Sequence, residues 1–181
     1  MSVSRVVLGL GSNIQRVEHL HAGLEALSEL LGELHCSPVF ESLPVGIKSG
    51  PFYNLAVSGT TDLPLGELDR KLKFIEADNG RYAPDRKGLP LDIDVLLYDE
   101  LVGNFHGLIL PRAEILKNAF VLWPLALLEP QTRHPSLGKT FAELWSEARI
   151  DQQLWPVPFQ WRGSELTPVD LLQAYPTPPA P

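Results

Sequence analysis

Two aspartates, Asp92 and Asp94, are separated by a single residue in the otherwise apolar run 91–98. Because side chains alternate along a β-strand, both carboxylates would project from one face, with Cα atoms about 6.5–7 Å apart. Two negative charges this close on an apolar strand are costly unless a positive group neutralises them. Mg²⁺ prefers carboxylate oxygens and keeps coordination positions for water or phosphate. The pair therefore predicts a magnesium site with a phosphate-bearing partner. A salt bridge at one aspartate and a hydrated sheet face at the other would give the same pattern.

A basic loop comes directly before these acids. Residues 81–90 contain Arg81, Arg86 and Lys87 among prolines and glycines. Positive side chains beside a metal-binding pair can stabilise the negative charge of a reacting phosphate. For Arg81 the alternative is an ordinary surface charge.

The hydrophobic periodicity predicts the strands and helices that position these residues. Strands are expected over residues 3–10, 39–42, 54–59 and 91–98. Helices are expected over residues 17–31, 63–79, 113–117, 120–128 and 140–148. The first six elements run strand, helix, strand, strand, helix, strand. This order predicts an α+β fold, a ferredoxin-like sandwich with an antiparallel sheet and helices on one face.

Two segments are expected to lack regular structure. The loop 43–51 contains two prolines and two glycines, the composition of a ligand lid. Seven of the 17 prolines fall within residues 156–181, which predicts an extended, partly mobile tail. We therefore expect one folded domain over residues 1–150 and a Pro-rich C-terminal extension over residues 151–181.

The composition excludes several classes of protein. A chain of 181 residues with 44% hydrophobic and 20% charged residues is typical of one soluble globular domain. The net charge of -7 should repel the phosphate backbone of nucleic acids. The single cysteine, Cys36, excludes an internal disulfide and a cysteine-built zinc site. The apolar run 6–10 is too short for a signal-peptide core. We expect a cytoplasmic protein, a monomer or weak homodimer, with small-molecule partners and no nucleic-acid or membrane partner.

Four motifs occur in order along the chain: LGLGSN at 8–13, FYNLAV at 52–57, LDID at 91–94 and FVLWPL at 120–125. In this order and at these separations the chain resembles the 6-hydroxymethyl-7,8-dihydropterin pyrophosphokinase family of folate biosynthesis, from residue 6 to about residue 135. The resemblance implies an ATP-dependent pyrophosphokinase. In such enzymes ATP donates its β,γ-pyrophosphate to the pterin hydroxymethyl group, AMP leaves, and two Mg²⁺ ions bridge the phosphates.

The resemblance also implies roles for the pterin-side residues. Phe52 and Phe120 match the aromatic pair between which the pterin ring stacks, and Asn54 matches the amide that hydrogen-bonds its polar edge. Further pterin contacts are implied at Ser42, Val45 and Gly46. Without the family, the two phenylalanines would be interpreted as core aromatics and Asn54 as a strand-end residue.

Other roles concern the metal and the nucleotide. Asp92 and Asp94 match the family's metal ligands, Arg81 matches a loop arginine that approaches phosphate, and Glu76 matches a position near the nucleotide. A glutamate at a helix end is otherwise usually solvated.

The chain departs from the family pattern on the phosphate side. Leu89 replaces an arginine before the metal strand, Arg112 replaces a histidine, and Asn118 replaces an arginine two residues before the second stacking aromatic. Cations at such positions stabilise the charge of a transferred phosphoryl group. One explanation is that other basic side chains bind the phosphates instead. The nucleotide contacts would then come from Arg86, Lys87, Arg112 and Lys117. The alternative is a paralogue that binds or senses pterins with weak or no transferase activity. An unrelated metal-dependent nucleotidyl transferase is a third interpretation.

Overall fold

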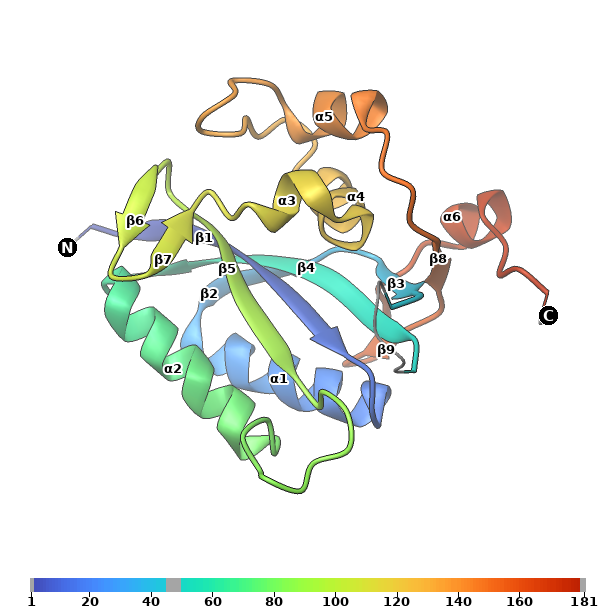
Figure 1. Ribbon diagram of the computed structural model, residues 1–181, viewed down its shortest axis with the longest axis horizontal. Coiled ribbons are helices and arrows are strands. Elements are labelled where there is room, and N and C mark those ends of the chain that lie inside the picture. The colour runs from blue at the N-terminus through green and yellow to red at the C-terminus, as the bar shows by residue number, and fades with distance from the viewer. Residues whose placement is uncertain (1, 45–49, 180–181) are drawn as a thin grey trace.

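An antiparallel sheet with helices on both sides forms the centre of the computed structural model, which describes residues 2–44 and 50–179 (Figure 1). The strands and helices up to the acid pair are β1 (Ser4–Ser12), α1 (Arg16–Leu30), β2 (Gly32–Cys36), β3 (Val39–Ser42), β4 (Phe52–Thr61), α2 (Leu65–Asp78) and β5 (Asp92–Tyr98). They follow the predicted strand and helix order, with β2 as an additional edge strand.

The strand order of the central sheet is β5-β1-β4-β3-β8, where β8 is Leu154–Val157, with β2 also paired to β4, so β1 is an interior strand. β1 pairs with β4 on one side and with β5 on the other, and β3 and β2 both pair with the far edge of β4. All of these pairings are antiparallel. The prediction of an α+β, ferredoxin-like sandwich with an antiparallel sheet is therefore confirmed.

The two faces of the sheet have different partners. Helices α1 and α2 cover one face, as predicted, and their leucines Leu24 and Leu72 join the core formed with Leu8 of β1. The opposite face carries three further helices: α3 (Glu114–Lys117), α4 (Ala119–Leu128) and α5 (Phe141–Glu147). Their apolar side chains build a second, smaller core against Val7 and Leu96. On this face Asp92 and neighbouring residues line a cavity at the start of α4.

The C-terminal residues contain more regular structure than an extended tail. They form β8 (Leu154–Val157), β9 (Gln160–Trp161), β10 (Ser164–Glu165) and α6 (Val169–Ala174), and a hairpin of β6 (Gly103–Phe105) and β7 (Leu108–Leu110) precedes α3. Strand β8 pairs with β3 and extends the central sheet. Pro156 is tolerated because β8 is an edge strand, and Pro168 stands at the N-cap of α6. The tail was predicted to be extended and partly mobile, whereas residues 154–174 form these short strands and a helix. The mobility of this segment and the domain boundary near residue 150 stay predictions.

None of the helices in the described part of the chain has both the length and the apolar character needed to cross a membrane. Most of the loop 43–51, predicted to be a lid, lies outside the described residues.

Candidate functional site

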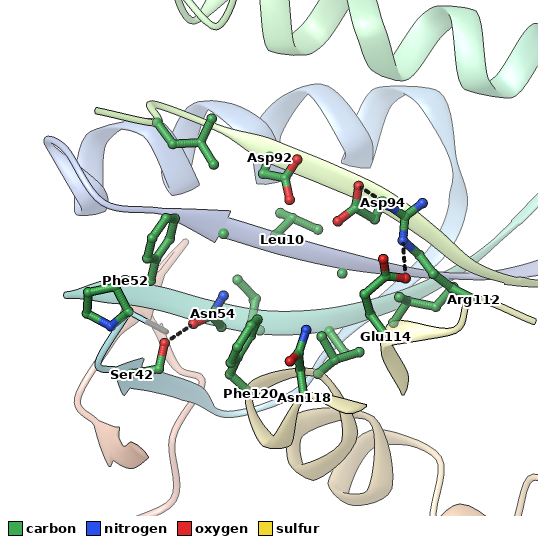
Figure 2. A pocket seen from close by; sticks show the side chains of 18 of the residues that line it. Leu10, Ser42, Phe52, Asn54, Asp92, Asp94, Arg112, Glu114, Asn118 and Phe120 are labelled. Carbon is green, nitrogen blue, oxygen red and sulfur yellow. Dashed lines mark hydrogen bonds and ion pairs between the residues drawn. The ribbon is translucent and has the colours of Figure 1, made fainter. Parts of the chain in front are cut away.

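A cavity of about 370 Å³ lies on the open face of the sheet, between the ends of β1, β4 and β5 and the start of α4 (Figure 2). We call it the central cavity. It is lined by residues of β1, β4 and β5 and by residues near the start of α4. Among its lining residues are Phe52, Asn54, Asp92, Asp94, Arg112 and Phe120. Strand alternation therefore brings Phe52 and Asn54 to the same site as Asp92 and Asp94, and helix α4 adds Phe120.

Two glycines of β1 form the floor of the cavity. Gly11 pairs with Asn54 on one side and Asp92 on the other, and Gly9 pairs with Asp94. A Cβ atom on Gly11 would lie 3.0 Å from Asn54 Nδ2, closer than an ordinary contact. The glycine thus leaves room for the amide of Asn54 to lie across β1.

The aromatic side of the cavity contains Phe52 and Phe120, which project from β4 and α4 and are each only partly buried. Asn54 is buried beside them, and its Oδ1 accepts a hydrogen bond from Ser42 Oγ at 2.7 Å. Because that bond occupies the amide oxygen, the Nδ2 group is turned away from Ser42 and over Gly11. This part of the site can hold a flat ring and hydrogen-bond to its edge.

The opposite side of the cavity carries charge. Asp92 accepts a hydrogen bond from Arg81 Nη1 at 2.9 Å, and Asp94 Oδ1 lies 3.5 Å from Arg112 Nη2. Arg112 Nε lies 3.1 Å from Glu114 Oε2 but makes no hydrogen bond, so this contact is an ion pair only. Burial, followed by the negative charge of Asp92, raises the pKa of Asp94 above its ordinary value despite Arg112. The acid pair is therefore incompletely neutralised by the protein.

Glu76 is buried below this acid pair and does not line the central cavity. Its carboxylate accepts hydrogen bonds from the backbone N–H of Ile93, at 2.8 Å, and from the Tyr82 hydroxyl, at 2.7 Å. The bond to Glu76 raises the pKa of Tyr82 to about 12. The sequence carries a signal for this burial, because residue 76 continues the four-residue steps of the buried leucines Leu68 and Leu72. Through its hydrogen bond to Ile93, Glu76 holds the backbone of β5 between the two aspartates.

The remaining predicted nucleotide contacts are not all brought to the cavity. Arg81 and Arg86 line an adjoining opening that shares Phe52 and Leu89 with the central cavity. Lys87 and Lys117 are exposed and line neither space.

Two further predicted contacts, Val45 and Gly46, lie outside the described residues. All three departures from the family pattern line the central cavity: Leu89, Arg112 and Asn118.

Sequence reasoning did not identify Glu114 as a site residue. It lines the cavity and shares Arg112 with Asp94. A glutamate at the start of a short helix resembles any surface charge in the sequence, so no local signal distinguishes it. Only the folded arrangement shows that it competes for the positive charge of Arg112.

The oxygen ligands that the chain offers for a metal are few. Within residues 2–44 and 50–179, no cluster of three or more His, Cys, Asp or Glu side chains could enclose a metal ion. Asp92 and Asp94 alone would leave most coordination positions to water or to a bound phosphate. Mg²⁺ has this preference, and the donor set therefore fits it.

Residues 7–130 match the family model described as 7,8-dihydro-6-hydroxymethylpterin-pyrophosphokinase (HPPK). A 2-amino-4-hydroxy-6-hydroxymethyldihydropteridine pyrophosphokinase of Aquifex aeolicus is 34% identical over 148 residues, covering 80% of this chain and 92% of the relative. A protein of the same name from Pseudomonas aeruginosa is 36% identical over 148 residues, covering 78% and 90%.

Other similar proteins are longer than this chain. A folate synthesis bifunctional protein of Chlamydia trachomatis is 32% identical over 155 residues, which cover 77% of this chain and 34% of that protein. Among solved structures, Plasmodium falciparum HPPK-DHPS with pteroate superposes with a TM-score of 0.66 at 15% identity, covering 81% of this chain and 44% of that one. This structural likeness supports the fold.

Proposed function

The chain belongs to the 7,8-dihydro-6-hydroxymethylpterin-pyrophosphokinase family, and on this basis we propose that its central cavity transfers pyrophosphate from ATP to 6-hydroxymethyl-7,8-dihydropterin. The enzyme is an ATP-dependent diphosphotransferase of folate biosynthesis. In the reaction the hydroxymethyl oxygen attacks the β-phosphorus of ATP, the bond between that phosphorus and the α,β-bridging oxygen breaks, and AMP leaves with that oxygen.

One observation supports this assignment of the cavity: a neutral aromatic slot and a charged acid pair share a single space. Phe52 and Phe120 would stack on the pterin ring, and Asn54 and Ser42 would hydrogen-bond its polar edge. A volume of about 370 Å³ is within the usual range for a small-molecule site. The hydroxymethyl group would then point toward Asp92 and Asp94.

The charges around the acid pair support a requirement for Mg²⁺. Among the described residues, the ion pairs of this region join two arginines to four carboxylates: Arg81 to Glu76 and Asp92, and Arg112 to Asp94 and Glu114. This excess of negative charge would repel the triphosphate of ATP. Asp92 and Asp94 would hold Mg²⁺, two ions being expected, and the bound metal would neutralise phosphate charge and orient the reacting groups.

Arg81 and Arg112 would act on the phosphates. Each guanidinium lies beside one aspartate, within reach of an oxygen bound next to that aspartate. A groove lined by Glu76, Arg81, Tyr82 and His106 opens next to the acid pair and would accommodate the rest of the nucleotide. Within the part of the chain that the structure describes, the lining of the central cavity includes Arg112 and no lysine, and Arg81 lies beside Asp92 in the adjoining opening.

The proposal is tested by measuring AMP formation by the purified protein. AMP should appear only when ATP, Mg²⁺ and 6-hydroxymethyl-7,8-dihydropterin are all present. Turnover of ATP that is indifferent to pterin would contradict the acceptor, and pterin binding without any AMP would contradict the transfer.

A further inference from the structure

Gln152 forms a bridge to the wall of the central cavity from outside the segment that matches the family. Its Oε1 accepts a hydrogen bond from the backbone N–H of Ala119 at 2.8 Å, and its Nε2 donates to Asn118 Oδ1 at 3.0 Å. Asn118 and Ala119 are the N-cap and first residue of α4, just before the stacking residue Phe120. Gln152 itself does not line the cavity, whereas Asn118 does.

These two contacts fix which way each amide is turned. A backbone N–H can only donate, so the group of Gln152 facing Ala119 must be its oxygen. The –NH₂ group of Gln152 is then the one facing Asn118, and it requires the oxygen of Asn118 as acceptor. Asn118 uses no side-chain atom to cap its own helix. Its Nδ2 group is therefore left free of these contacts and available as a donor.

The position of Asn118 shows what this donor would meet. In Figure 2 Asn118 lies beside Phe120 on one wall of the cavity, and Asp92 and Asp94 project from the facing strand. A group between these walls would sit where the aromatic slot meets the acid pair. An oxygen of the transferred diphosphoryl group occupies that junction if the proposed function holds.

We propose that Gln152 is a positioning residue that orients the Nδ2 donor of Asn118 toward a phosphate oxygen of the bound nucleotide. The inference rests on the proposed function and adds to it a neutral hydrogen-bond donor set by a residue of the C-terminal extension. A neutral amide at this position would orient the phosphate through a directional hydrogen bond without adding another full charge. Arg81 and Arg112 remain the charged groups next to the acids.

The decisive variant is Gln152→Glu. Its carboxylate can still accept from Ala119 N–H, but it cannot donate to Asn118, so Asn118 should turn and present Oδ1 to the cavity. A donor toward phosphate is thereby replaced by an acceptor, without a change in any residue that lines the cavity. We expect kcat/KM for ATP to fall roughly 10- to 100-fold, the range for losing a hydrogen bond to a charged group. Pterin binding without nucleotide, measured by fluorescence titration, should change less than about threefold.

Folding is not expected to suffer, because a carboxylate near the first turn of a helix is electrostatically favourable. Gln152→Met provides a second variant with no added charge. This variant leaves the Asn118 amide free to rotate. Its kcat/KM for ATP should therefore lie between the wild-type value and that of Gln152→Glu. The matched control is Gln153→Glu, which adds the same charge at the neighbouring, exposed side chain and should keep wild-type kinetics.

A double-mutant comparison separates orientation from a general structural effect. In an Asn118→Ala background, Gln152→Glu should have less than about a twofold further effect. Equal losses in both backgrounds, or wild-type kinetics of Gln152→Glu, would overturn the inference while AMP formation by the wild type still supports the proposed function. Absence of AMP formation by the wild type would overturn both.

Discussion

Replacing Asp94 by Asn should stabilise the metal-free protein while abolishing its activity. The ionised form of Asp94 is disfavoured by burial and by the charge of Asp92, and Arg112 compensates only in part. Arg112 keeps its ion pair with Glu114 in the variant, so no buried cation is left alone. Asparagine carries no charge, so the variant avoids this cost, which under the proposed function is the consequence of keeping two carboxylates for a metal.

The size and pH dependence of this effect follow from the direction of the pKa shift. One pKa unit corresponds to about 1.4 kcal/mol, and the Asp94 side chain is 32% exposed, so we expect a gain of roughly 1–2 kcal/mol near neutral pH. The raised pKa means that the native state keeps its proton where the unfolded chain has released it. Wild-type stability thus falls as the pH rises above about 4, and the gain of Asp94→Asn should vanish below that pH.

The assay is chemical or thermal unfolding in the presence of a chelator, where the variant should melt roughly 2–6 °C above the wild type. Asp92→Asn is the matched control, because Asp92 accepts a 2.9 Å hydrogen bond from Arg81 that the variant weakens. It should gain no stability and lose up to about 1 kcal/mol. Both variants should lose AMP formation and metal-dependent nucleotide binding. Equal stabilisation by the two variants, or a lower melting temperature for Asp94→Asn, would refute the reasoning.

Three shorter predictions concern other parts of the molecule. Phe120→Ala should weaken pterin binding about tenfold through the loss of one stacking face, with nucleotide binding retained; titrations with each ligand alone would check this. Gly11→Ala should weaken pterin binding several-fold, because the new Cβ would lie 3.0 Å from Asn54 Nδ2. Gly9→Ala, whose Cβ would meet only ordinary contacts at 3.5 Å, should bind pterin normally in the same titration. Burial raises the pKa of the Cys36 thiol to about 11. Its alkylation at pH 8, followed by mass spectrometry, should be roughly 100-fold slower than that of an exposed thiol and should accelerate toward pH 10; rapid labelling of the folded protein at pH 8 would contradict the burial.

The features of the site that depend on local rules could be predicted from the sequence. The common face of Asp92 and Asp94 follows from strand alternation alone, and the structure bears it out. The leucine stripes of α1 and α2 likewise predict which helix faces pack on the sheet. By contrast, β2 was not predicted because its residues are mostly exposed and its pairing with β4 is irregular. β8 was hidden by Pro156, which an edge strand accepts.

The long-range pairings could not be predicted in this way. Nothing near Arg112 in the sequence indicates that Asp94 and Glu114 share its charge. Nothing near Gln152 indicates that it contacts the start of α4. Such contacts depend on how the second layer of helices is placed over the sheet, and that placement is set by the packing of whole elements.

The ion pairs of Arg112 also help to explain how the site could transfer pyrophosphate although its phosphate-binding residues differ from the family pattern. A free arginine in the cavity would attract ATP whether or not metal is present, whereas Arg112 is already held between two carboxylates. Only a cation bound at Asp94 would shift the balance of charge and make that guanidinium available to a phosphate. The site should therefore bind nucleotide weakly without Mg²⁺, and the dependence of ATP affinity on Mg²⁺ should be steeper in the wild type than in Glu114→Gln, where Arg112 is less restrained.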